Sequence, residues 1–166
     1  MLFKYCVAGC LALAGAVFLL SRAAIHSTEA SEPVQTDLAA AAKAGFGEVS
    51  VWLTKSADMV PADKYSYRPV GTIRTFGELM GHVADGYGFY CGRAAGRNTE
   101  WSDAISKGPT DKATIVRKLK EATDACTSAS LTQPMHFMAG VVHANLHYGN
   151  AIVYLRMLGL VPPSSS

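Results

Sequence analysis

Two histidines four residues apart, His143 and His147, are the first candidates for chemistry in this sequence. They fall in a segment with a helical pattern, and residues four apart on a helix project from the same face, one turn apart. A third histidine, His82, lies midway along another predicted helix, on its apolar side between Leu79 and Val83. In a helical bundle, a mid-helix residue that faces inward can meet the middle of a facing helix. We therefore expect the three imidazoles to be able to share one ion.

Three neutral imidazoles form a donor set with definite metal preferences. Nitrogen ligands suit zinc, nickel, copper or iron, whereas magnesium and calcium prefer oxygen. Three protein ligands leave one or more coordination positions open for water or substrate, which is typical of catalytic rather than structural sites. The predicted cofactor is a divalent transition metal, with zinc or nickel preferred. The alternative stays open that His82 is a hydrogen-bonded core histidine and that the other two line a polar groove.

The composition of the chain excludes several classes of protein. It has 166 residues, of which 49% are hydrophobic and 17% charged, and this combination argues against intrinsic disorder. The formal net charge is +2, so the electrostatic footprint of a DNA- or RNA-binding protein is missing and no nucleic-acid partner is expected. The sequence shows no Ser–His–Asp set, phosphate-binding loop or cysteine-nucleophile motif.

The first thirty residues have the features of a targeting segment. Lys4 precedes an uncharged, mainly apolar run at residues 5–20, and small residues follow up to Ala30. This order is typical of a secretory signal peptide, and an uncleaved N-terminal membrane anchor is the alternative. In both cases we expect residues 31–166 to form one domain outside the cytoplasm, periplasmic or secreted, that contacts a membrane only through the N-terminal segment.

Hydrophobic periodicity predicts four helices and no strand in this domain. The predicted helices cover residues 34–59, residues 76–95, a segment that starts near Thr110 or Asp111, and a last segment from Thr132 or Gln133 to residue 157. Thr75 and Glu78 fit a capping box at the start of the second helix. Gly96 and Gly159 fit the positions that end the second and fourth helices. The predicted fold class is therefore all-α, a four-helix bundle.

The last helix and the tail after it resemble a known family. The stretch HANLHYGNAIVYLRMLGLVPPS, from His143 to Ser164, is similar to the C-terminus of the DinB-like family, in which a histidine pair precedes a Tyr-Leu-Arg segment, a glycine and a Pro-Pro-Ser end. The segment GELMGHVAD at residues 77–85 is similar to the one that supplies the family's first histidine. The loop at residues 65–69 and the turn at residues 93–96 also resemble the family, so the resemblance extends over about residues 34–164.

The resemblance implies a four-helix bundle with up-down-down-up topology, in which a long crossover joins parallel second and third helices. It also implies a divalent-metal site whose ligands in this chain are His82, His143 and His147. One departure concerns the residues around the last ligand. Many members read His-His-Arg-Gly-Gln there, and this chain reads Leu-His-Tyr-Gly-Asn at residues 146–150. A role of that arginine in holding an anionic thiol cofactor is therefore not expected of Tyr148.

The implied topology also bears on Cys91 and Cys126, which lie near the C-terminal ends of the second and third helices. Those ends are neighbours in a parallel pair and far apart in an antiparallel hairpin. In an oxidising compartment, two such cysteines suggest a disulfide. We therefore hypothesise a Cys91–Cys126 bond, with two buried free thiols as the alternative.

Two functions are compatible with these observations. The first is a metal-dependent enzyme, with thiol-dependent transferase or hydrolase-like chemistry at the open metal position; some family members resemble thiol-dependent transferases and isomerases. Residues near the ligands, namely Asp85, Asn145, Tyr148 and Asn150, are candidates to orient them. The second is a non-catalytic metal-binding or stress-related scaffold, with a homodimer left open. In both cases the partner is an unidentified small molecule.

Overall fold

A computed structural model describes residues 32–166 of the chain, with side chains from Asp37 onward. The described part contains four α-helices, two short 3-10 turns and no strand. The elements are α2 (Glu32–Met59), η1 (Ala62–Lys64), α3 (Phe76–Ala94), α4 (Lys112–Thr127), α5 (Pro134–Met157) and η2 (Pro163–Ser165). The prediction of an all-α four-helix bundle is confirmed. The predicted signal peptide or anchor at residues 1–30 lies outside the described residues.

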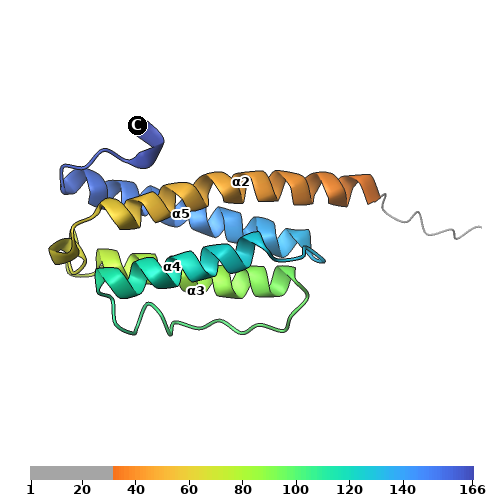
Figure 1. Ribbon diagram of the computed structural model, residues 1–166, viewed down its shortest axis with the longest axis horizontal. Coiled ribbons are helices and arrows are strands. Elements are labelled where there is room, and N and C mark those ends of the chain that lie inside the picture. Colours follow the sequence, from red (N-terminus) through yellow and green to blue (C-terminus); the bar gives the residue numbers. More distant parts are fainter. Residues whose placement is uncertain (1–31) are drawn as a thin grey trace, which may run out of the picture. The chain divides into compact units, whose positions relative to one another are not determined.

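Helices α3 and α4 run in the same direction. A disulfide between Cys91 and Cys126, with the two Cα atoms 5.3 Å apart, joins the C-terminal turns of the two helices. At the other end, a Cβ added to Gly77 in the first turn of α3 would collide with Thr110, just before α4 begins. The segment between the two helices, residues 95–111, must therefore return along the whole length of the bundle (Figure 1).

Helices α2 and α5 run opposite to that pair. The Lys112 ammonium at the start of α4 donates to the carbonyl of Val60, just after α2 ends, at 2.9 Å. The Tyr154 hydroxyl near the end of α5 donates to the carbonyl of Arg74, just before α3 begins, at 2.6 Å. The order of directions is therefore up, down, down, up, as the family resemblance implied.

Local sequence signals set the helix ends. Thr75 accepts from the Glu78 amide, and the Glu78 carboxylate accepts from the Thr75 amide, so the predicted capping box is present. Asp111 caps α4 by accepting from the Thr114 amide. Beyond α3, Gly96 has a φ of +78°, a left-handed conformation that glycine adopts without a Cβ penalty and that ends the helix.

The core is a column of aromatic and aliphatic side chains between the four helices. Phe46 of α2 packs against Tyr87 of α3 and Phe137 of α5, with ring centroids 5.1 and 5.3 Å away. Further along, Trp52 stacks on Tyr148 at 5.1 Å. These contacts hold α2 against the α3–α5 pair. None of the helices in residues 32–166 combines the length and apolarity needed to cross a bilayer.

The crossover between α3 and α4 is fastened to α3 by one buried carboxylate. Asp85 accepts from the backbone amides of Ile105 and Ser106, at 3.0 and 2.9 Å. One turn earlier, a Cβ on Gly81 would lie 2.9 Å from the Ser106 Cα atom, so only glycine lets the loop approach this closely. The loop is therefore a packed layer of the bundle, and it brings the side chains of residues 101–107 over the middle of α3.

The disulfide predicts a measurable stabilisation. Bridging residues that are 35 positions apart restricts the unfolded chain, which should stabilise the native state by about 3–4 kcal/mol. Reduction should lower the free energy of unfolding, measured by urea titration, by this amount. A Cys91→Ala/Cys126→Ala variant should have a free energy of unfolding close to that of the reduced protein. Titration that finds two free thiols in the mature domain, residues 31–166, purified without reductant would contradict the bond, because Cys91 and Cys126 are its two cysteines.

Candidate metal centre

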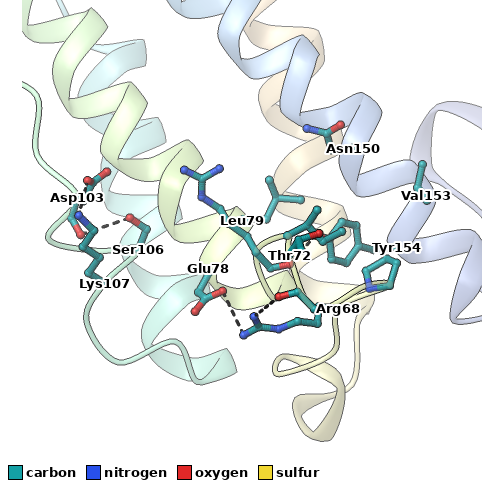
Figure 2. A pocket seen from close by; sticks show the side chains of 14 residues that line it. Arg68, Thr72, Glu78, Leu79, Asp103, Ser106, Lys107, Asn150, Val153 and Tyr154 are labelled. Atoms are coloured by element: carbon teal, nitrogen blue, oxygen red, sulfur yellow. Dashed lines mark hydrogen bonds and ion pairs between the residues drawn. The ribbon is translucent and has the colours of Figure 1, made fainter.

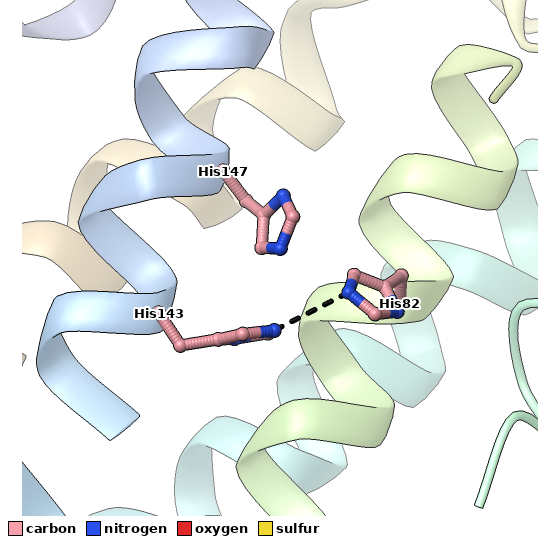
Figure 3. A group of neighbouring side chains, drawn as sticks. All are labelled: His82, His143 and His147. Carbon is pink, nitrogen blue, oxygen red and sulfur yellow. Dashed lines mark hydrogen bonds between the residues drawn. The ribbon is translucent and has the colours of Figure 1, made fainter. Parts of the chain in front are cut away.

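Three histidines from two helices meet in the middle of the bundle. His82 comes from α3 and His143 and His147 come from successive turns of α5, and their ligand nitrogens all lie within 4.8 Å of one another. The Nε2 atoms of His82 and His143 are 3.3 Å apart. Figure 3 shows a ring nitrogen of His147 directed toward the same point. The structure therefore brings together all three residues that the sequence suggested as metal ligands.

The geometry fits a transition-metal ion. Nitrogens bound to tetrahedral zinc at 2.0–2.1 Å are about 3.4 Å from each other, and the His82–His143 separation already matches this value. The Nδ1 atoms of His82 and His143 are buried without a hydrogen-bond partner among the described residues. Among the described residues, the polar contact of these two rings is therefore made through their Nε2 atoms, which face each other. Within residues 32–166, the cluster consists of the three imidazoles and includes no carboxylate or thiolate.

The site keeps its imidazoles neutral. Burial, together with the neighbouring His82 and Arg74, lowers the pKa of His143 to about 4. Burial also lowers the pKa of His147 to about 4, assisted by the other two histidines and Arg74. The pKa of His82 is lowered as well, mainly by burial and then by Arg74. A neutral imidazole has a free lone pair, so the cluster is ready to bind a cation at neutral pH.

A glycine on α3 makes room for one ligand. A Cβ built on Gly86 would collide with the His143 ring, whereas a Cβ on Gly88, two residues further along the same helix, would meet no atom within 4 Å. Gly86 is one turn beyond His82, on the side that faces α5. The missing side chain therefore lets the His143 ring lie against the α3 backbone and reach His82.

Aromatic side chains cover one side of the cluster. Trp101, from the crossover loop, has its ring centroid 5.3 Å from His82 and 5.8 Å from His143. Tyr90 of α3 lies 5.3 Å from His143. Asp103 accepts from the Trp101 indole nitrogen at 2.9 Å and so holds the ring in place. Because Asp85 fixes the loop that carries Trp101, the indole ring is held over the cluster and restricts the access of water on this side.

The residues expected to orient the ligands have different roles. The Asn150 amide lies 3.4 Å from Nδ1 of His147, so it does contact a ligand. The Asn150 atom that faces this nitrogen is Nδ2. Turning the amide over by 180° would place Oδ1 there, where it would accept from the Nδ1–H of a His147 ring that binds metal through Nε2. Asp85 instead anchors the crossover loop. Asn145 donates to the carbonyl of Val141 on its own helix, and Tyr148 packs on Trp52 and accepts from the Ser164 amide.

An open pocket lies near the cluster. The cavity has a volume of about 690 Å³ and lies between the loop before α3, the crossover loop and the last turns of α5. Its lining includes Asn150, which contacts His147, and Asp103, which holds Trp101. Figure 2 shows these walls, with Arg68 beside Glu78 and Lys107 beside Asp103. None of the three histidines lines the cavity, so a small molecule in this pocket would reach the cluster past Asn150.

Sequence reasoning overlooked three parts of this site: Trp101, Gly86 and Arg74. Trp101 and Arg74 lie in loops, where no periodic pattern reveals which way a side chain points. Gly86 does carry a signal in the sequence. A glycine inside a helix costs about 1 kcal/mol relative to alanine, so its presence there indicates a close contact with a neighbouring element.

Comparison with known proteins supports one family. The family model described as the DinB superfamily matches residues 53–150, a stretch that contains all three histidines. Neither a curated protein nor a solved structure gave a significant match to the chain.

The lowered pKa values predict how the metal-free protein responds to acid. The unfolded chain takes up protons near pH 6.5, while folded His143 and His147 stay neutral down to about pH 4. The contribution of these two histidines to the free energy of unfolding should therefore be constant above pH 6.5 and fall as the pH is lowered toward 4. Thermal melts of metal-free protein across this range measure the slope. A His143→Asn/His147→Asn variant should show a shallower slope, and equal slopes would contradict the assignment.

Proposed function

This chain belongs to the DinB superfamily, and from that premise we propose that it is an exported enzyme that depends on a divalent transition metal. The observation that carries the proposal is the convergence of three neutral imidazoles beside an open pocket. A structural site would be closed by a fourth protein ligand, whereas three ligands leave a position for water or substrate. Zinc or nickel suits this donor set best.

The roles of the residues follow from their contacts. His82, His143 and His147 would hold the ion, which when bound acts as a Lewis acid and lowers the pKa of a bound water or thiol. Asn150 would keep the His147 ring in one orientation and tautomer. Trp101 and Tyr90 would cover one side of the cluster, and substrate would approach from the pocket that Asn150 lines.

Hydrolase-like chemistry is favoured over a thiol-dependent transfer. Tyr148 stands where many members have an arginine suited to an anionic thiol. Its ring is buried against Trp52, and its hydroxyl accepts from Ser164. The position therefore serves packing and supplies no cation. An exported protein would also meet little low-molecular-weight thiol, so we propose that a metal held by the three histidines would supply Lewis-acid chemistry for the hydrolysis of a small substrate.

Export is proposed on two observations. The N-terminal segment has the pattern of a signal peptide or anchor, and the domain carries the disulfide between Cys91 and Cys126. Structural disulfides persist in oxidising compartments and are rare in the cytosol. The two observations are independent, and both favour a periplasmic or secreted location.

Elemental analysis tests the metal site. We expect about one equivalent of zinc or nickel per wild-type chain and almost none in His143→Ala. His136→Ala is the matched control, because His136 lies on the same helix, outside the cluster, and should keep the metal. The rate of hydrolysis of simple activated esters should be proportional to the metal content of wild type and of the two variants. Bound metal without turnover of any ester, amide or thiol substrate would instead favour the non-catalytic scaffold.

A pair of glycine variants tests the same site without removing a ligand. Alanine at Gly86 should push the His143 ring away and weaken metal affinity by about tenfold or more, similar to the loss of an outer-shell partner. Alanine at Gly88 meets open space, so affinity should be unchanged and the helix slightly more stable. Equal affinities of the two variants would show that His143 does not bind the ion.

A further inference from the structure

The pocket beside the histidines has one cation in excess. Its lining carries three basic side chains, Arg68, Arg74 and Lys107, and two acidic ones, Glu78 and Asp103. Arg68 pairs with Glu78 at 3.7 Å, and Lys107 pairs with Asp103 at 2.9 Å (Figure 2). Within residues 32–166, Arg74 pairs with no carboxylate. The pocket therefore offers one uncompensated positive charge to a ligand.

The backbone holds Arg74 at this place. Its carbonyl accepts from the Tyr154 hydroxyl of α5 at 2.6 Å. The next residue, Thr75, is the N-cap of α3 and is fixed by the reciprocal bonds with Glu78. Because α3 and α5 also carry the three histidines, Arg74 and the metal ligands are parts of one rigid frame. Only the side chain of Arg74 is free to adjust to a ligand.

Arg74 is linked to the cluster through the wall of the pocket. Both Arg74 and Asn150 line the cavity, and Asn150 contacts His147. The field of Arg74 also contributes to lowering the pKa of each of the three histidines. A guanidinium binds a carboxylate or phosphate through two parallel hydrogen bonds, which fixes orientation as well as position.

We propose that Arg74 is the anchor for a negatively charged group of the substrate, a small organic carboxylate or phosphate whose reactive end reaches the three-histidine site. The proposal rests on the proposed function and narrows it to anionic substrates. It explains why two of the three basic residues are neutralised by partners within the pocket while Arg74 is not.

Two matched probes test the anchor at pH 8, namely imidazole-4-acetate, which carries a carboxylate, and its neutral amide. Binding to the cobalt(II)-loaded full chain is followed by the visible spectrum, and binding to the metal-free chain by NMR. Wild type should bind the carboxylate about tenfold more tightly than the amide. Arg74→Gln should abolish this preference without weakening the amide, and Arg156→Gln, outside the pocket, should retain it.

The outcomes separate the two proposals. Equal affinities of wild type for the two probes, or a preference that survives in Arg74→Gln, would overturn the anchor and leave the metal site standing. A preference that depends on Arg74 in the metal-free chain, together with failure to bind cobalt(II), would support the anchor and overturn the metal-dependent function.

Discussion

The close approach of α3 and α5 is the constraint on which the candidate site depends. His82 and His143 are 61 positions apart in sequence and lie on different helices, and an imidazole is too short to bridge a wide gap. Gly86 removes the side chain that would separate the two helices at this level. The three nitrogens can then meet, and the burial that results keeps the rings neutral.

Two loops with different roles surround the cluster. The crossover loop, fastened by Asp85, lays Trp101 over one side and excludes water. The loop before α3 places Arg74 in the lining of the open pocket, where Tyr154 holds its backbone. The result is an asymmetric site with an apolar wall and a positively charged entrance. The proposal of an anionic substrate rests on this arrangement.

The disulfide and the crossover loop solve a problem that parallel helices create. Adjacent antiparallel helices need only a short turn, whereas α3 and α4 require a connection as long as the bundle. A long connection is entropically costly unless it is held along its length. Here Asp85 and the close contact at Gly81 hold its middle, and Cys91–Cys126 ties the far ends of the helices together.

The sequence by itself determined the four helices, their caps and the identity of the three histidines. Hydrophobic period, capping residues and glycines act within a few positions of each other, and the spacing of His143 and His147 is a property of one helix. Only the tertiary structure decided which side chains surround the cluster. Trp101, Arg74 and the contact role of Gly86 depend on how loops fold back and how closely two helices approach. Those distances come from the packing of residues far apart in the chain, which no local pattern records.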